Sequence, residues 1–240
     1  MFADIHGTYD FLNHFLSMGR DHAWRRRTAR LLGLASHERV LDLCAGTGDL
    51  ALELASHEPA LVVAADFTPE MLVKSVQKAG AAGRTIRHAV ADALALPFAD
   101  ASFDALTVAF GIRNVADLDA GLRELARVLR PGGRAGILEF SRSRRRFSRG
   151  LHAVYCGAVL PVIGRLVSGH RTAYSYLPAS IDEFPEREEL ASRMIAAGFS
   201  TVEITPMNFD LVTLHLGVIA SSDRASSAAP SIAAHEATAQ

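Results

Sequence analysis

Apolar residues recur along the first 140 positions in short runs, many of them β-branched, which alternate with longer segments of helical periodicity. The runs cover residues 39–44, 60–66, 85–91, 103–110 and 134–140. Strands that alternate with helices in this way pair in parallel and are covered by those helices. The pattern therefore predicts an α/β protein with a mostly parallel sheet.

Three helices are predicted between these strands. The first covers residues 49–57, and the second covers 69–79, where Pro69 suits the first helical turn. The apolar face of the third helix consists of Leu118, Leu122, Leu125 and Leu129. We expect this helix to stop at Pro131, which two glycines follow.

The remaining segments are assigned by composition. Residues 1–220 are predicted to form one domain, because no linker rich in Pro, Gly or Ser divides them. Within this domain, residues 1–38 are predicted to be an N-terminal helical cap and residues 145–180 a helical insert after the fifth strand. Residues 221–240 are rich in Ala and Ser, so we expect a disordered tail there.

Composition and charge exclude several classes of protein. A formal net charge of -1 argues against nucleic acid as a partner, since nucleic-acid-binding domains carry a strong basic excess. Cys44 and Cys156 lack the spacing of a disulfide framework or a zinc site, so we expect no metal and a reducing, cytoplasmic setting. The first residues also lack the basic and apolar regions of a signal peptide.

A glycine turn carries the first functional signal. The stretch "VLDLCAGTGDLALELA" joins the first strand to the first helix, with Gly46 and Gly48 at the turn. Ligands of open parallel sheets collect at such turns, at the carboxyl ends of the strands. The letters also fit a dinucleotide fingerprint, and Asp66 at the end of the second strand suits the ribose of any adenosine cofactor.

The carboxylates around the turn separate two cofactor classes. Asp49 at the first helical turn would compete with a pyrophosphate for the helix N-terminus. S-adenosylmethionine carries a sulfonium and an ammonium instead, and Asp42 and Asp49 put negative charge on either side of the turn. Asp42, Asp49 and Asp66 together therefore favour the methyl donor. Asp49 also fits a plain helix cap, and Asp42 also fits a residue that fixes the loop.

Motifs after the third strand extend the signal. Asp92 and Ala93 follow that strand, where a carboxylate can accept a hydrogen bond from an adenine amino group or simply form a turn. The segments "HAVADALALPF", "SFD" and "RVLRPGG", in this order, make the chain similar to the class I S-adenosylmethionine-dependent methyltransferases. This resemblance implies a Rossmann-like fold with a mostly parallel seven-stranded sheet flanked by helices.

Further segments resemble one branch of these enzymes, the quinone-biosynthesis C-methyltransferases. They are "YDFLNHFLSMGRDHAWRR", "AFGIRNV", "LEFSR" and "LPVIGRLVSGHRTAYSYLPASIDEFP", and the match covers residues 1–220. The resemblance implies C-methylation of a polyprenyl quinol ring in menaquinone or ubiquinone biosynthesis. A methyltransferase acting on another lipid or phenol, an NAD-dependent oxidoreductase and a cofactor-binding module without catalysis remain as alternatives.

The resemblance also implies roles for single residues. The family's cofactor contacts correspond to Thr47, Asp66, Asp92 and Ala93. Its substrate-side motifs correspond to Tyr9, Arg113 and Asn114. Ala109 stands where the family often has a small hydroxyl residue or glycine, so only its backbone is expected to contact the cofactor.

A quinol ring carbon becomes a nucleophile when a phenolic proton is lost. A phenol has a pKa near 10, so ionising it at pH 7 requires about 4 kcal/mol of anion stabilisation. Arg113 is our candidate for the stabilising cation, acting directly or through a water. His22 and His215 are further candidates for the proton acceptor, although a lone histidine is more often structural.

The insert suggests a membrane surface. Five arginines in "SRSRRRFSRG" precede an apolar run over residues 151–164 that is too short to span a bilayer. Basic residues attract anionic lipid, so we expect peripheral contact at the inner face of the membrane, with the insert as a lid over a polyprenyl substrate. An ordinary helical cap is the alternative, and the sequence leaves a homodimer open.

Overall fold

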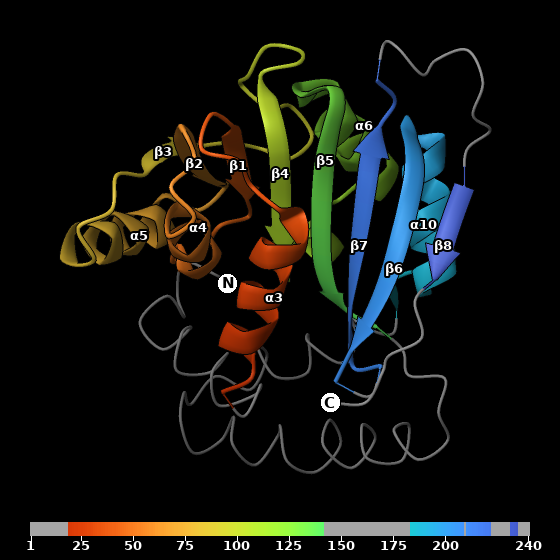
Figure 1. Ribbon diagram of the computed structural model, residues 1–240, viewed down its shortest axis with the longest axis horizontal. Helices are drawn as coiled ribbons and strands as arrows, with labels where there is room; N and C mark the ends of the chain where they lie inside the picture. The colour runs from red at the N-terminus through yellow and green to blue at the C-terminus, as the bar shows by residue number, and fades with distance from the viewer. Residues whose placement is uncertain (1–18, 142–182, 209, 222–230, 235–240) are drawn as a thin grey trace.

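A computed structural model describes residues 19–141, 183–208, 210–221 and 231–234, which form one mixed sheet between two layers of helices (Figure 1). The sheet has eight strands in the order β3-β2-β1-β4-β5-β7-β6-β8. Their bounds are β1 Arg39–Leu43, β2 Leu61–Asp66, β3 Arg87–Val90, β4 Phe103–Ala109, β5 Leu129–Phe140, β6 Phe199–Met207, β7 Val212–Ile219 and β8 Ser231–Ala234.

The first five strands pair in parallel, as the sequence predicts. β7 runs antiparallel to both β5 and β6, and β8 pairs in parallel with β6. The helices are α3 Asp21–Leu32, α4 Asp49–Ala55, α5 Pro69–Ala81, the 3-10 turn η1 Ile112–Asn114, α6 Leu118–Val128 and α10 Arg187–Ala196.

Alternate residues of the central strands point to opposite faces, and each face has its own core. On one face, Val40 packs with Leu50 and Leu54 of α4 and with residues of α3. On the other face, Leu41 belongs to a larger core that α6 and α10 cover. The continuous apolar runs of the sequence thus reflect strands that are buried on both sides.

The junction between α6 and β5 differs from the prediction. We expected the helix to include Leu129 and to stop at Pro131, but α6 ends at Val128 and β5 begins at Leu129. Pro131 therefore lies inside the strand, where the register with β4 shifts between Phe103 and Ala105. A proline is tolerated at such an irregularity, because the ladder hydrogen bonds are already interrupted there.

The C-terminal segment also differs from the prediction. We expected seven strands and a disordered tail over residues 221–240, but residues 231–234 of that tail form β8. All four residues of β8 are exposed. The strand pairs through its backbone with Thr201–Ile204 of β6, and backbone hydrogen bonds do not require the large apolar side chains that this segment lacks.

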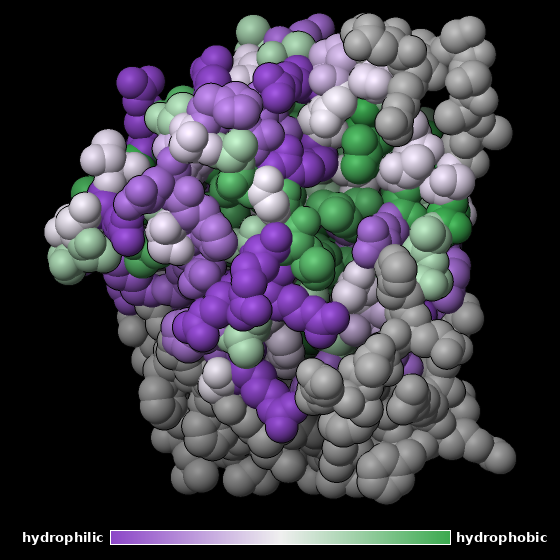
Figure 2. Space-filling model, in the orientation of Figure 1, coloured by the Kyte–Doolittle hydropathy of each residue, from purple (hydrophilic) through white to green (hydrophobic). Residues whose placement is uncertain are grey.

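Several expectations fall on residues outside the described part. Tyr9, most of the N-terminal cap and the insert over residues 145–180 are among them. In the described part, α3 lies within the cap and presents exposed arginines, which form much of the polar band at the centre of Figure 2. No helix of the described part is long and apolar enough to cross a membrane.

Candidate active site

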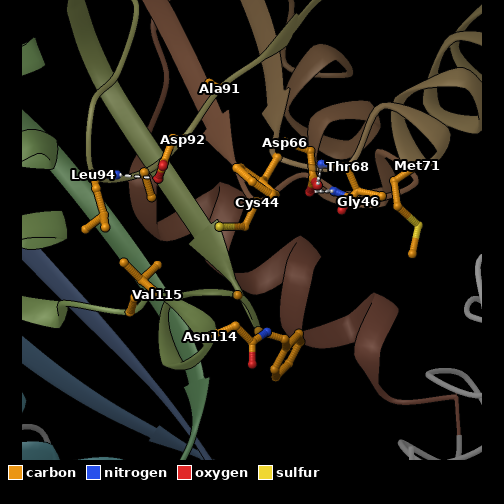
Figure 3. A pocket seen from close by; sticks show the side chains of 15 residues that line it. Cys44, Gly46, Asp66, Thr68, Met71, Ala91, Asp92, Leu94, Asn114 and Val115 are labelled. Atoms are coloured by element: carbon orange, nitrogen blue, oxygen red, sulfur yellow. Dashed lines mark hydrogen bonds between the residues drawn. The ribbon is translucent and has the colours of Figure 1, made fainter. Parts of the chain in front are cut away.

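The carboxyl ends of β1, β2 and β4 border a pocket of about 350 Å³. Figure 3 shows side chains from the glycine turn, from the loops after β2 and β3, and from η1 around the same space. The predicted residues that line it are Gly46, Asp66, Asp92, Ala93 and Asn114. The structure therefore brings together, at one edge of the sheet, residues that the sequence separates by up to 68 positions.

Close packing shapes the glycine turn. Gly48 has a φ of 86°, and a Cβ at this residue would lie 2.1 Å from Ser75 Oγ of α5. Gly111 packs equally closely on the turn, because its Cβ would lie 2.3 Å from the Cβ of Cys44. A side chain at either position would clash, so both require glycine; Gly111 lines the pocket, whereas Gly48 packs on α5 and is not among the lining residues.

Asp66 fastens the end of β2 to the glycine turn. Its Oδ2 accepts the N–H of Gly46 and its Oδ1 accepts the N–H of Thr68, each over 2.8 Å. Burial raises the pKa of Asp66, and these backbone hydrogen bonds oppose the rise. Hydrogen bonds from the Thr68 side chain and from the backbone of Phe67 also lower this pKa, so the loop after β2 holds the carboxylate at the edge of the pocket.

Asp42 is a buried carboxylate beneath the turn. Its Oδ1 accepts a hydrogen bond from Thr107 Oγ1 over 2.7 Å, and its Oδ2 has no partner within the described residues. Asp42 borders a small cavity that also reaches Gly46 and Ala109. Burial raises the pKa of Asp42 to about 7, against the opposing effects of Thr107 and of the Arg25 charge.

The structure corrects our argument from Asp49. Asp49 Oδ1 forms an ion pair with Lys78 Nζ at 2.7 Å, and the same Nζ donates to Thr47 Oγ1 over 2.9 Å. The N-cap of α4 is Gly48, so Asp49 does not cap the helix. Because Lys78 offsets its charge, Asp49 does not distinguish a cationic ligand from a pyrophosphate as we expected.

Asp92 and Ala93 line the side of the pocket next to β3. Asp92 Oδ1 accepts the N–H of Leu94 over 2.9 Å, which fixes the loop and leaves the second oxygen outside that bond. Ala109 borders the smaller cavity beside Asp42 rather than the main pocket. Ala109, the residue at which this sequence differs from the family pattern, therefore lies at the back of the glycine turn.

On the side of η1, Asn114 lines the pocket and Arg113 stands behind it. Arg113 donates from Nη1 to the carbonyl oxygen of Phe110 over 2.9 Å and forms an ion pair with Glu139 of β5. Our candidate cation is thus paired with a buried carboxylate, which compensates its charge.

The two histidines differ in their surroundings. His22 is exposed on α3. His215 is buried in β7, where its Nε2 lies 2.9 Å from the carbonyl oxygen of Arg187, and burial lowers its pKa to about 4. Neither is among the described residues that line the pocket, so the structure does not support either as proton acceptor.

Sequence reasoning missed several residues of the site. Phe67 and Met71 line the pocket after β2, and Phe67 is 72% exposed although it is apolar. An aromatic residue directly after the predicted Asp66 was the available signal. Glu139 lies in the segment "LEFSR" that carries the family resemblance, but we gave it no role, because a carboxylate near the end of a strand is usually solvated. Among the described residues, no cluster of His, Cys, Asp and Glu could hold a metal ion.

The profile of the ubiE/COQ5 methyltransferase family matches residues 1–219. The chain belongs to this family. A demethylmenaquinone methyltransferase of Thermus thermophilus is 48% identical over 218 residues, which are 90% of this chain and 99% of that protein. The ubiquinone/menaquinone biosynthesis C-methyltransferase UbiE of Geobacter sulfurreducens is 45% identical, with 90% and 86% covered.

Solved structures support the same fold. A methyltransferase of Thermotoga maritima has a TM-score of 0.61 at 17% identity, covering 91% of this chain and 99% of its own. A methyltransferase of Aquifex aeolicus, described as dependent on S-adenosylmethionine, has a TM-score of 0.58 at 16% identity, with 81% and 89% covered. The protein is thus a methyltransferase with the α/β Rossmann-like fold that its sequence predicts, which decides against an NAD-dependent oxidoreductase.

Proposed function

We propose that this methyltransferase transfers a methyl group from S-adenosylmethionine to a ring carbon of a reduced polyprenyl quinone, with demethylmenaquinol as the acceptor. The observation that carries the proposal is a single pocket with two sides. Gly46, Asp66 and Asp92 line the donor side, and Asn114 lines the acceptor side. Relatives named for demethylmenaquinone methylation favour a naphthoquinol over a benzoquinol.

The donor side fits the chemistry of S-adenosylmethionine, which supplies a methyl group on a sulfonium. Asp66 is placed to accept the ribose hydroxyls, because it lines the pocket directly beside the glycine turn. Asp42 Oδ2, buried and without a partner in the described residues, suits a cationic ammonium. Asp92 and Ala93 would border the adenine, and Thr47 and Gly48 would shape the turn beneath.

On the acceptor side, the enzyme must favour the phenolate form of the quinol. The pair of Arg113 and Glu139 beside Asn114 places fixed hydrogen-bond donors and charges where water is scarce. Alignment of the acceptor carbon with the methyl group supplies a further part of the rate. Tyr9 is assigned to this side by the family resemblance alone, and the reaction requires no metal.

The lipid tail belongs to the same proposal. Burying a long polyprenyl chain completely would approach the limit of non-covalent affinity, at about 0.8 kcal/mol for each CH₂ group. We therefore assign residues 145–180 to a lid over the first isoprene units, and the arginines over residues 142–149 to anionic lipid. The enzyme then acts in the cytoplasm at the inner face of the membrane.

The test is incubation with methyl-labelled S-adenosylmethionine and chemically reduced demethylmenaquinol, followed by mass analysis of the product. A methylated ring carbon is expected with the quinol, and none with the oxidised quinone, which has no phenolic proton to lose. A benzoquinol with the same tail and a simple phenol are the comparison acceptors. Equal methylation of quinone and quinol, or preference for the simple phenol, would contradict the proposal.

A further inference from the structure

The ion pair of Arg113 and Glu139 adjoins the acceptor side of the pocket. Arg113 belongs to η1, directly before Asn114, and its Nη1 donates to the carbonyl oxygen of Phe110 over 2.9 Å. Both Asn114 and Phe110 line the pocket, and Figure 3 shows Asn114 pointing into the open space. Glu139 follows Leu138 of β5, whose carbonyl oxygen accepts the N–H of Phe110 over 2.9 Å.

The pair is buried, and its hydrogen bonding is incomplete. The side chains of Arg113 and Glu139 are 9% and 1% exposed. Glu139 Oε1 accepts from Arg113 and from the N–H of Phe140, and the guanidinium lies 5.6 Å from the centre of the Phe140 ring. Within the described residues, Arg113 Nε and Glu139 Oε2 have no hydrogen-bond partner. Buried polar groups normally do, so this donor and acceptor are of functional interest.

A second ion pair between an arginine and a glutamate provides a structural comparison for Arg113 and Glu139. Glu38, just before β1, binds Arg134 of β5 through both carboxylate oxygens, at 2.8 and 2.7 Å. This pair lies at the amino end of β1, away from the pocket, and the hydrogen bond from Arg134 lowers the pKa of Glu38 to about 2. For Glu139, burial outweighs the effect of Arg113 and raises the pKa.

We propose that Glu139 is a positioning residue for the methylation, one that holds Arg113 against the acceptor wall and offsets its charge. The inference rests on the proposed function. In this arrangement the charge behind the wall formed by Phe110 and Asn114 is that of a nearly neutral pair rather than of a full cation. Glu139 therefore sets how strongly Arg113 favours the phenolate, and with it the pKa of the bound quinol.

Other charged groups surround the same wall. They are Asp42 in β1, Asp66 at the end of β2, and Arg25 of α3, whose guanidinium lies 5.8 Å from the centre of the Phe110 ring. Burial raises the pKa of the Cys44 thiol. The charges of Asp66, Asp42 and Glu139 raise it further, and Arg113 opposes them. These groups stay the same in the variants below, so a change in pH dependence reports on Glu139.

Two substitutions test separately the negative charge of Glu139 and the length of its side chain. Glu139→Gln keeps an oxygen that accepts from Arg113 but removes the negative charge. Arg113 then becomes an uncompensated buried cation, which stabilises the phenolate, so the acidic limb of the kcat profile should move about one unit to lower pH. Glu139→Asp keeps the charge but is one methylene shorter, so kcat should fall on the order of 10-fold or more, because misplacing a supporting group is costly.

The experiment measures kcat and KM for quinol and methyl donor between pH 5.5 and 9 in the wild type, Glu139→Gln, Glu139→Asp and the matched control Glu38→Gln. The control should lower the melting temperature without moving the profile. S-adenosylhomocysteine affinity, measured by calorimetry, should stay within about 2-fold in all of them, which shows an intact donor side. The double variant Arg113→Gln/Glu139→Gln should give the same profile as Arg113→Gln alone, because Glu139 acts through Arg113.

The outcomes are distinguishable. If the wild type does not methylate the quinol, the proposed function fails. If the wild type does so and Glu139→Gln leaves the profile in place, or shifts it equally in the Arg113→Gln background, Glu139 does not act through Arg113 and the inference is wrong. If Glu139→Gln fails to fold, the comparison of Glu139→Asp with the wild type decides, since an unchanged kcat there overturns the positioning role.

Discussion

Asp66 shows how one side chain serves both the fold and the site. Its two oxygens bind the N–H groups of Gly46 and Thr68, so the carboxylate joins the first and second loops of the sheet while it faces the pocket. Asp66→Ala should weaken S-adenosylhomocysteine binding by about 1 to 3 kcal/mol, because the ligand hydroxyls lose an ionised acceptor. Calorimetry on the folded variant measures this loss, and unchanged affinity would contradict the assignment.

The raised pKa of Asp42 leads to a prediction about the pH dependence of stability. Its pKa is about 7 in the folded protein, against an ordinary value of 3.8. Between these values the folded state holds a proton that the unfolded state has released, so the contribution of Asp42 to stability is present at pH 4 and is lost as the pH rises to about 7. Asp42→Asn should remove this part of the pH dependence.

Urea unfolding of the protein without ligand at several pH values between 4 and 8 measures the effect. Asp66 and Glu139, whose pKa values are also raised, contribute in the same direction in both proteins. The difference between wild type and Asp42→Asn therefore isolates Asp42. A difference that does not change with pH would show that Asp42 is ionised throughout.

The acceptor side illustrates what residue types alone do not reveal. The sequence identified Arg113 and Asn114 through a motif, but the partner of Arg113 lies 26 positions away, in β5. Nothing in the local pattern around Glu139 indicates that it is buried beside a cation, because pairing of this kind depends on how β5 and η1 are stacked. The donor side was easier to predict, since its residues lie at or just after the carboxyl ends of strands that the sequence predicts.

At the scale of elements, the tight contact between the glycine turn and α5 holds the donor side in place. Gly48→Ala should reduce both stability and S-adenosylhomocysteine affinity, because a Cβ would lie 2.1 Å from Ser75 Oγ in a left-handed backbone. The left-handed conformation alone costs about 1 to 2 kcal/mol. Gly80→Ala is the matched control, since nothing lies within 4 Å of a Cβ there.

Gly80 lies within α5, so its replacement should stabilise the protein by about 0.5 to 1 kcal/mol. Thermal unfolding and calorimetry on both variants test the pair. If Gly48→Ala behaves like Gly80→Ala, the turn can move away from α5, and the close contact does not define the site.

The elements themselves were predictable to different degrees. β1, β2 and β4 are continuous apolar runs because both of their faces are buried, and this pattern is clear in the sequence, whereas β3 at the edge of the sheet is largely exposed. The start of β5 was misplaced because Pro131 and the following glycines normally end a helix, whereas here they accompany a register shift inside a strand. β8 was missed because its pairing uses the backbone of β6 and buries none of its own side chains.

In the whole molecule, the order of the strands places the pocket far from β8, the C-terminal strand at one edge of the sheet. The pocket lies at β1, β2 and β4, whereas β8 is the last strand on the opposite edge of the sheet. Residues that are exposed and distant from a pocket contribute little to binding or catalysis. We therefore expect β8, the described part of the C-terminal segment, to contribute little to the methyl transfer.

Deletion of residues 221–240 tests this separation, because it removes β8 and leaves β6 as the edge strand. We expect kcat and both KM values to stay within about 2-fold, and the free energy of unfolding to fall by about 1 kcal/mol, as is typical when exposed contacts are lost. The newly exposed edge of β6 offers unpaired backbone groups, so the truncated protein should also associate more readily at high concentration. Kinetics, urea unfolding and size-exclusion chromatography measure the three effects. A large fall in kcat with stability retained would mean that the C-terminal segment reaches the active site, and the separation argued from the strand order would then be wrong.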